Sequence, residues 1–253
     1  MMRIEYLYRY PVKGLTAEAL DQAKVEAGGA IPWDRAFALA QGDSGFDPAR
    51  PAWLPRHNFL CLMKNAKAAL LFSVFDPGSK TLRIKAPDGS GIEANAMTGV
   101  GRERIAAFLL DYLGEEARGD PAFHHVPRHV FGDQPGPVIS LNNLASLKDY
   151  ESKVGARRHR RRFRDNIWFS GAPAWAERAW IGREIQVGGA VLRVVNGTVR
   201  CPGTEVNPET GERDADPVAE LRSLFGNAEL GVYAEVIDGG RFALGDAMEL
   251  LNR

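Results

Sequence analysis

Short hydrophobic runs, separated by glycine, proline and polar residues, follow one another along most of the chain. Residues 3–10 alternate between large apolar and polar side chains, which predicts a strand that ends before Pro11. Residues 102–113 carry apolar side chains at helical spacing and stop at Gly114, which predicts a helix. Apolar runs predict further strands in this part of the chain at residues 36–40, 59–62, 68–75 and 81–85.

A polar segment, residues 115–136, contains glycine, proline and three histidines, so we place a domain boundary within it. The predicted domains are residues 1–120 and residues 121–253. In the second domain we expect helices at 142–153 and 217–225, and strands at 138–141, 166–169, 184–187, 191–195, 231–236 and 247–251. Many short strands and few helices predict a mainly β fold with a few helices (α+β) and barrel-like sheets.

The amino-acid composition argues against several classes of protein. The 32 Lys and Arg residues balance 32 Asp and Glu residues, which argues against a chain whose main role is to cover nucleic acid or an acidic membrane. Two cysteines far apart in sequence do not suggest a disulfide framework, and a reducing compartment fits better. The N-terminus has no secretory signal, and no run approaches about 18 apolar residues. We therefore expect a cytoplasmic protein without a membrane segment.

Cys201 is the first candidate for chemistry. It stands between Arg200 and the turn-forming pair Pro202-Gly203, whereas Cys61 lies in an apolar run. A neighbouring cation favours the thiolate, which attacks electrophiles and binds soft metals. The alternative is that Cys201 is a small hydrophobic residue at the end of a strand.

Four basic residues form the second candidate group. Lys13 follows a predicted strand, and Gly14 after it allows a ligand to approach the backbone closely. Arg35 precedes another strand, and Arg162 and Arg164 lie close together further along. Arginine offers a forked donor set and lysine a point charge, so these residues could form a phosphate cradle. The alternative is that each is an ordinary solvated surface charge.

The run Arg157–Arg164 contains seven basic residues among eight, counting His159. It could bind nucleic acid, but the neutral chain and the lack of interleaved aromatics argue against that. Docking of an acidic partner protein is the alternative that we keep. His124, His125 and His129 have no cysteine or acidic partner at metal-ligand spacing, so they do not predict a zinc site.

Several motifs occur in order along nearly the whole chain. They are Tyr10-Pro11-Val12-Lys13-Gly14, Asp34-Arg35-Ala36-Phe37, Arg162-Phe163-Arg164-Asp165-Asn166, Trp180-Ile181-Gly182, Arg200-Cys201, Asn207-Pro208-Glu209-Thr210-Gly211 and Gly245-Asp246. Together they resemble the MOSC family, the molybdenum cofactor sulfurase C-terminal domain proteins, and within it the amidoxime-reducing components. The resemblance implies an N-terminal β-barrel domain followed by a MOSC β-barrel domain.

The resemblance also implies roles for single residues. Cys201 matches the cysteine that ligates molybdenum, which makes it the expected catalytic residue. Lys13 and Arg35 match residues that hold the phosphate of molybdopterin, and Arg164 and Asn166 match residues that contact the cofactor. The full set of expected cofactor-binding residues is Lys13, Gly14, Arg35, Ser140, Arg162, Arg164, Asn166, Arg200 and Cys201.

Two positions depart from the family pattern. Gly14 stands where some relatives have serine, so a hydroxyl contact would be absent. Asp165 replaces the usual proline and adds a negative charge close to Arg164. Ser140, near the start of the MOSC part, is expected to line the site.

The resemblance favours a molybdenum-dependent reductase of N-hydroxylated or related N-oxygenated compounds. A plant-type ferredoxin module needs four cysteine ligands, so we expect electrons from a separate donor protein. The alternative is a carrier that binds molybdenum cofactor, or sulfur on Cys201, and hands it on. A β-barrel that binds nucleic acid is a third and less favoured reading.

Overall fold

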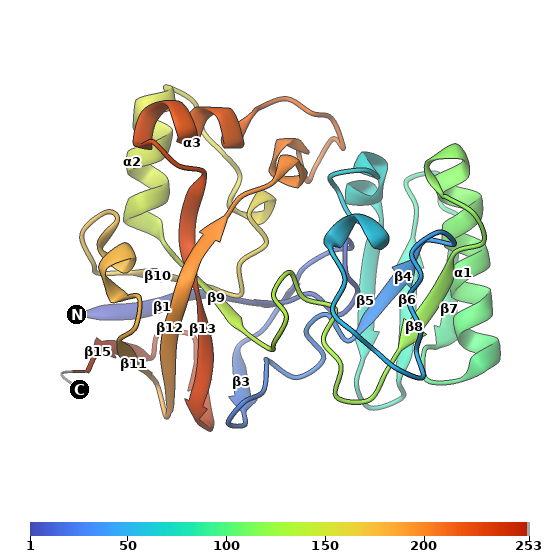
Figure 1. Cartoon of the computed structure of the whole chain (residues 1–253), viewed down its shortest axis with the longest axis horizontal. Helices are drawn as coiled ribbons and strands as arrows, with labels where there is room; N and C mark the ends of the chain where they lie inside the picture. The colour runs from blue at the N-terminus through green and yellow to red at the C-terminus, as the bar shows by residue number, and fades with distance from the viewer. Residues whose placement is uncertain (252–253) are drawn as a thin grey trace.

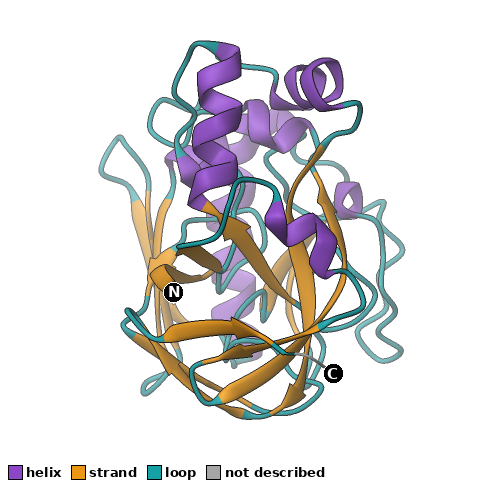
Figure 2. Ribbon diagram, turned by 90° about the vertical axis from the view of Figure 1, so that its left-hand side faces the viewer, coloured by secondary structure: helices purple, strands orange, loops and turns teal. Residues whose placement is uncertain are grey.

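The computed structural model describes residues 1–251, which form a mainly β fold with three α-helices. The larger unit is built from β1 (Met2–Arg9), β9 (Ile139–Asn143), β10 (Ile167–Ser170), β11 (Glu184–Val187), β12 (Ala190–Val199), β13 (Glu229–Asp238) and β15 (Ala247–Leu250). These strands form a closed seven-stranded barrel in the order β10-β9-β13-β12-β11-β15-β1, closed by pairing of β1 with β10 (Figures 1 and 2). β9 and β10 are parallel, and the other neighbours are antiparallel.

The first strand of the chain belongs to the barrel that residues 139–250 otherwise form. β1 pairs with β10 on one side and with β15 on the other, and its residues Ile4 and Leu7 are buried in the barrel core. Two short strands also lie with this unit: β2 (Glu18–Ala19) pairs with β1, and β3 (Gln22–Val25) pairs with β14 (Gly240–Ala243). The chain thus begins in the barrel, builds a second unit and returns, so the boundary at residue 120 stays a prediction.

The smaller unit has its own core. β4 (Phe37–Ala40) pairs with β8 (Ala122–His125), and β5 (Phe72–Asp76), β6 (Thr81–Lys85) and β7 (Gly91–Asn95) form a three-stranded sheet. The helix α1 (Gly99–Leu113) packs against β7 and β8, on the right of Figure 1. The Thr98 side chain accepts a hydrogen bond from the Gly101 N–H, so it caps this helix at its start.

Two helices cover one end of the barrel, α2 (Leu144–Val154) and α3 (Pro217–Phe225) (Figure 1). The side chains of Asn143 and Asp216 cap their N-termini, and Gly155 and Gly226 end them in the left-handed conformation. The predicted helix at 217–225 is therefore confirmed, and its boundaries follow from local capping chemistry. No helix in residues 1–251 combines the length and apolar character needed to cross a membrane.

The sequence prediction fails around residues 59–71. Phe59 forms only an isolated bridge with Ala40, and Ala66–Leu70 is a 3-10 helix rather than a strand. Asn65 explains the difference, because its backbone N–H donates to the Cys61 carbonyl and turns the chain. The remaining 3-10 helices are Arg56–Asn58, Gly114–Glu116, Arg160–Arg162, Ala176–Trp180 and Pro202–Glu205.

Candidate functional site

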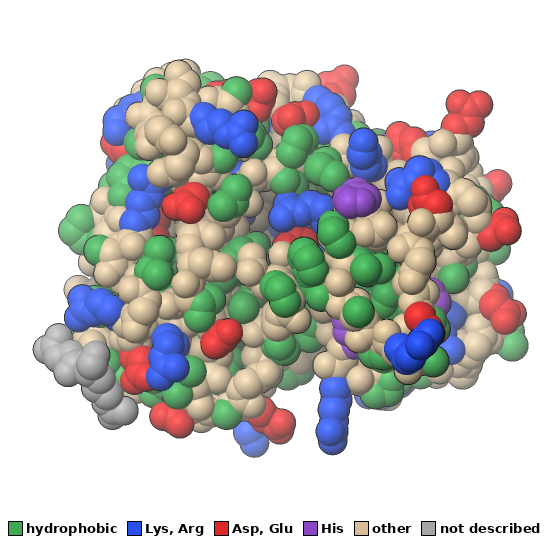
Figure 3. Space-filling model, in the orientation of Figure 1, with side chains coloured by type: hydrophobic (Ala, Val, Ile, Leu, Met, Phe, Trp, Pro, Cys, Tyr) green, Lys and Arg blue, Asp and Glu red, His purple; other side chains and the backbone are tan. Residues whose placement is uncertain are grey.

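An open cavity of about 960 Å³ lies where the barrel meets the smaller unit. Its lining includes every residue that the sequence predicts for cofactor binding, namely Lys13, Gly14, Arg35, Ser140, Arg162, Arg164, Asn166, Arg200 and Cys201. Figure 3 shows basic side chains in a hollow near the middle of one face, bordered by hydrophobic side chains. A cavity between two structural units is a usual place for a small-molecule ligand.

The topology brings these distant segments together. Residues 11–15 follow β1, and residues 162–166 precede β10. Because β1 and β10 pair in antiparallel fashion, the end of one lies beside the start of the other. Cys201 lies two residues beyond the end of β12 and lines the same cavity.

Arg35 and Arg164 form a pair held by one aromatic ring. Arg35 donates from Nη2 to the Arg164 carbonyl oxygen at 2.8 Å and from Nη1 to Oδ2 of Asp34 at 2.5 Å. Both guanidinium groups lie 4.4 Å from the centre of the Tyr10 ring, a favourable cation–π arrangement. Both residues have positive φ, 48° for Arg35 and 57° for Arg164. Strained backbone of this kind concentrates at ligand sites, which supports a binding role.

Arg164 forms no ion pair within residues 1–251. Its side chain is half-buried and donates from Nη1 to the Leu15 carbonyl oxygen at 2.7 Å. Desolvation by the surrounding protein lowers the pKa of Arg164 to about 10, so the side chain stays charged at neutral pH. A desolvated cation that no carboxylate contacts directly favours the binding of an anionic group.

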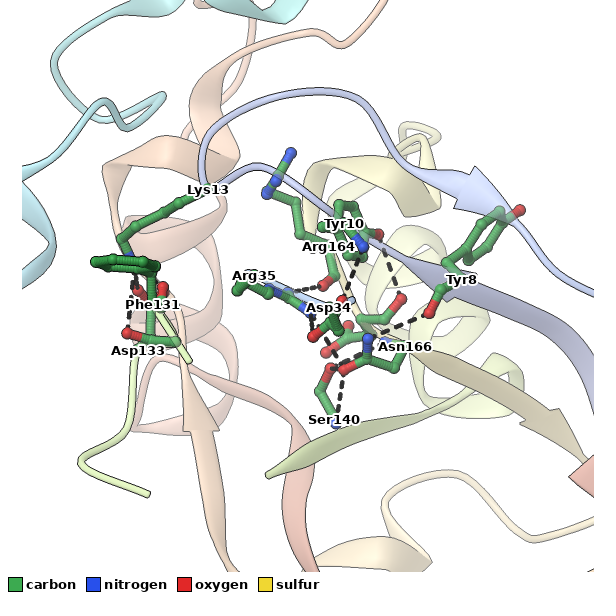
Figure 4. A network of polar contacts seen from close by, with 12 residues as sticks. Tyr8, Tyr10, Lys13, Asp34, Arg35, Phe131, Asp133, Ser140, Arg164 and Asn166 are labelled. Carbon is green, nitrogen blue, oxygen red and sulfur yellow. Dashed lines mark hydrogen bonds and ion pairs between the residues drawn. The ribbon is translucent and has the colours of Figure 1, made fainter. Parts of the chain in front are cut away.

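Lys13, by contrast, is already paired. Its Nζ donates to the carbonyl oxygens of Phe131 and Gly132, at 2.9 and 3.3 Å, and to Oδ1 of Asp133 at 2.6 Å. Nη1 of Arg56 lies 3.6 Å from Oδ2 of the same carboxylate. Burial opposes the charge of Asp133, but Lys13 and Arg56 outweigh it and lower the pKa of Asp133 below its usual range. Figure 4 shows this group beside Lys13 as separate from the group around Arg35.

Cys201 is half-buried in the cavity wall. The cation whose charge is influenced by Cys201 is Arg56, which lines the same cavity. Burial opposes the charge of Arg56, but Asp133 and Cys201 outweigh it and raise the pKa of Arg56. Cys61 lines the same cavity but is buried, and burial raises the pKa of its thiol.

Arg200 instead anchors the segment that precedes Cys201. It donates from Nε to the Leu230 carbonyl oxygen at 2.8 Å and from Nη1 to that of Phe163 at 2.7 Å. Its Nη2 lies 3.0 and 2.8 Å from the two oxygens of Asp165, and both side chains are almost completely buried. The negative charge that the sequence places close to Arg164 is therefore paired with Arg200. A direct contact of Arg200 with cofactor stays a prediction.

Two polar atoms in the cavity lining have no partner. Arg162 donates from Nη1 to the Glu205 carbonyl oxygen at 2.8 Å and pairs with Asp214. Its Nε, however, is buried without a hydrogen-bond partner in the described part of the chain, and so is Oγ1 of Thr198. Buried polar atoms are rarely left unpaired, so these two fit a ligand rich in oxygen and nitrogen atoms.

Ser140 and Asn166 bind each other and position Arg35. The Ser140 N–H donates to Oδ1 of Asn166 at 3.1 Å, and the Asn166 N–H donates to Oγ of Ser140 at 2.9 Å. Nη1 of Arg35 lies 3.3 Å from the same Oδ1, as the dashed lines in Figure 4 show. The predicted roles of Ser140 and Asn166 as direct cofactor contacts remain predictions.

The backbone conformation at position 14 explains why this chain has glycine there and not serine. Its φ is +86°, and a Cβ atom would lie only 2.7 Å from the Leu60 carbonyl oxygen. A serine therefore does not fit this backbone without movement of the neighbouring segment.

Sequence reasoning missed Arg56, Asp133 and Thr198. Arg56 lies in a 3-10 helix and Asp133 in an irregular segment, so neither had a periodic signal. Thr198 did carry a signal, because it lies near the end of β12, two residues before Arg200 and three before Cys201.

The basic run Arg157–Arg164 borders a second open cavity, of about 1020 Å³. Carboxylates of the chain lie near four of its members: Glu220 near Arg158, Glu209 near His159 and Arg161, and Asp214 near Arg162. Arg160 lies over the Tyr6 ring, 3.7 Å from its centre, and Arg157 is exposed. Neither of these two pairs with a carboxylate within residues 1–251.

Comparison with known proteins agrees with this architecture. The family model of the MOSC N-terminal beta barrel domain matches residues 1–117, and that of the MOSC domain matches residues 127–249. Mitochondrial amidoxime-reducing component 1 of Mus musculus is 32% identical over 162 residues, which cover 59% of this chain and 47% of that protein. The Homo sapiens protein of the same name is 31% identical over 129 residues, which cover 46% and 37%.

The chain thus matches less than half the length of these curated relatives. Among solved structures, the YUAD protein from Bacillus subtilis aligns with 99% of this chain and 96% of its own, at 16% identity and a TM-score of 0.46. The two domain matches together account for nearly all of the sequence. The chain belongs to the MOSC family, with an N-terminal MOSC β-barrel domain ahead of the MOSC domain.

Proposed function

We propose that the chain binds molybdenum cofactor in the cavity between the two units and reduces N-hydroxylated or related N-oxygenated compounds. The main support for the proposal is that Arg164 and Cys201 line the same cavity. Arg164 is charged at neutral pH and forms no ion pair with a carboxylate in residues 1–251. A cofactor that joins a soft metal to a phosphate needs a thiolate and a cationic surface in one cavity.

The residues of the cavity fit such a ligand. The unpaired Nε of Arg162 and Oγ1 of Thr198 offer a donor and a hydroxyl to the polar atoms of a pterin or phosphate. Arg35 and Arg164, held over Tyr10, offer guanidinium groups for the phosphate. Cys201 offers one soft sulfur ligand, with Arg56 beside it.

When bound, the cofactor supplies the two-electron redox chemistry. The protein contributes binding and orientation. The paired Ser140 and Asn166 fix Arg35, and Arg200 with Asp165 fixes the segment that carries Cys201.

The first test is the molybdenum content of purified protein after expression with ample cofactor supply. We expect Cys201→Ser to lose molybdenum and Cys61→Ser, which alters the same cavity wall, to retain it. Undiminished molybdenum in Cys201→Ser would remove this sulfur as the ligand. No molybdenum in the wild-type protein would count against the proposal as a whole.

The second test separates a reductase from a carrier of cofactor or of sulfur. Loaded protein with an artificial reductant should consume an amidoxime or a hydroxylamine if it is a reductase. A carrier would exchange cofactor or sulfur without consuming the substrate. The name of the curated relatives, which describes amidoxime reduction, supports the first alternative.

Turnover requires two electrons for each substrate molecule. We propose that a separate donor protein delivers them, and that the chain works in the cytoplasm. The exposed Arg157 and the neighbouring Arg160 are the proposed contact for this donor.

A further inference from the structure

The cationic lining of the cavity already contains an anion, the carboxylate of Asp133. Its Oδ1 lies 2.6 Å from Nζ of Lys13, and its Oδ2 lies 3.6 Å from Nη1 of Arg56. The two cations come from distant segments, the loop after β1 and the 3-10 helix Arg56–Asn58, and one carboxylate bridges them. The Asp133 side chain is 34% exposed and lines the cavity, so it stands where a ligand could reach it.

Lys13 has no N–H left for a ligand while this arrangement holds. An ammonium group has three N–H donors. Three consecutive residues, Phe131, Gly132 and Asp133, accept them through two carbonyl groups and the carboxylate. Arg164 differs, because it has no acid partner within residues 1–251. Lys13 and Arg56 in the cavity lining are therefore paired with one carboxylate, whereas Arg164 in the same lining forms no ion pair within residues 1–251.

The carboxylate is carried by a segment that could release it. Asp133 lies in residues 126–138, which connect β8 to β9 without a helix or strand. The Phe131 N–H donates to the Arg35 carbonyl oxygen at 2.8 Å and fixes the backbone just before the acid. The carboxylate itself is held by Lys13 and Arg56, which come from other segments of the chain.

We propose that Asp133 is an internal competitor for ligand anions, which occupies the Lys13–Arg56 end of the cavity and weakens the binding of a free phosphate there. An incoming phosphate group must displace the carboxylate from Lys13 or sit beside a like charge, and both reduce affinity. A ligand that is also held through Cys201 can overcome this competition, whereas an unattached phosphate cannot. This inference rests on the proposed function only in assuming that the natural ligand carries a phosphate.

The test uses inorganic pyrophosphate as the probe and protein purified without cofactor. Isothermal titration calorimetry would compare the wild-type chain with Asp133→Asn, Asp133→Glu and Asp47→Asn. We expect Asp133→Asn to bind pyrophosphate about tenfold more tightly than wild type, because one repelling charge is gone. Asp133→Glu keeps the charge and should bind as weakly as wild type. Asp47, which pairs with Arg50 at 3.0 Å and does not line the cavity, controls for net charge.

Thermal unfolding provides a second measurement. Asp133→Asn leaves Lys13 without its acid, so we expect a lower melting temperature that pyrophosphate raises by more than it raises that of wild type. Equal or weaker binding of pyrophosphate by Asp133→Asn would overturn the inference. If wild type and Asp133→Asn bind equally and Arg164→Gln abolishes binding, only the inference fails. If no protein in the series binds pyrophosphate, both the inference and the proposed anion-binding role of the cavity fail. The molybdenum content then tests separately whether Cys201 is the metal ligand.

Discussion

Arg35 donates a hydrogen bond from Nη2 to the carbonyl oxygen of Arg164 at 2.8 Å, across a sequence separation of 129 residues. A side chain at the edge of the smaller unit thereby holds the backbone of the loop that precedes β10 in the barrel. Both arginines have positive φ, so tertiary contacts rather than local preference maintain their conformations. An anion bound by this pair would contact both units at once, and its binding free energy would add to their association.

Replacing Arg164 separates a binding role from a structural one. We expect Arg164→Gln to weaken pyrophosphate or cofactor binding about tenfold to hundredfold, because charge-assisted hydrogen bonds to the anion are lost. The free energy of unfolding should fall by only about 1–2 kcal/mol, because the Leu15 hydrogen bond and the Tyr10 contact are lost but no ion pair is broken. Calorimetry and urea unfolding check these two expectations. Arg161→Gln, in the same basic run, is the control, and normal molybdenum loading of Arg164→Gln would contradict the prediction.

The buried pair of Asp165 and Arg200 predicts the opposite behaviour. Their side chains are 1% and 4% exposed, so removal of either partner leaves a desolvated charge. We expect Asp165→Asn and Arg200→Met each to lower the free energy of unfolding by about 3–5 kcal/mol. The double variant should lose less than the sum of the two, which a double-mutant cycle in urea would measure. Additive losses would show that the two side chains act independently.

Gly14 offers a direct test of the departure from the family pattern. Gly14→Ser places a Cβ atom 2.7 Å from the Leu60 carbonyl oxygen at a φ of +86°, so we expect a loss of about 2–3 kcal/mol in the free energy of unfolding. Gly45 is the matched control, because its φ is +67° but a Cβ atom there meets nothing within 4 Å. Gly45→Ser should cost about 1 kcal/mol. Equal costs at the two sites would mean that the steric contact is unimportant.

The histidines of the smaller unit predict a dependence of stability on pH. Burial lowers the pKa of His124, His125 and His129 in the folded chain, so the unfolded chain binds more protons near pH 6. Their contribution to stability is present above about pH 6.5 and is lost as the pH falls below it. The melting temperature of wild type should therefore drop more between pH 7.5 and 5.5 than that of the triple His→Gln variant. His57→Gln serves as the control, and identical drops in all three proteins would contradict the prediction.

Capping residues in the sequence correctly predicted where the helices α1 and α3 end. Asp216 and Gly226 bound α3 at the two ends that the sequence indicates, and Gly114 ends α1. The apolar run at 59–62 was predicted as a strand, but its residues are buried without forming one. Only Phe59 pairs with Ala40, because the chain turns at Asn65. β8 was missed because its polar sequence, with two histidines, lacks the apolar alternation of a strand.

The candidate site shows the same division. The motif residues lie next to strands, and the pairing of these strands brings the residues together. Lys13 follows β1 and Arg164 precedes β10, for example, and β1 pairs with β10. Arg56 and Asp133 had no such signal, because they meet only when two irregular segments fold over Lys13. Nor could sequence adjacency show that Arg200 faces Asp165 while Arg56 lines the same cavity as Cys201. Side-chain pairing in the loops is a tertiary property, and it determines which cations remain available to a ligand.

The ion pairs within the run Arg157–Arg164 indicate which arginines are available to an electron-donor protein. Three of its six arginines lie near carboxylates of the chain, whereas Arg157 is exposed and has no acid partner in residues 1–251. We expect Arg157→Glu to lower turnover with an acidic protein donor about fivefold to tenfold at low ionic strength, and less at high salt. Turnover with a small artificial reductant should stay unchanged, because the cavity is untouched. Lys24→Glu, an exposed reversal on β3, is the control for net charge. If Arg157→Glu leaves both the donor-dependent rate and its salt dependence unaltered, the donor contacts another surface.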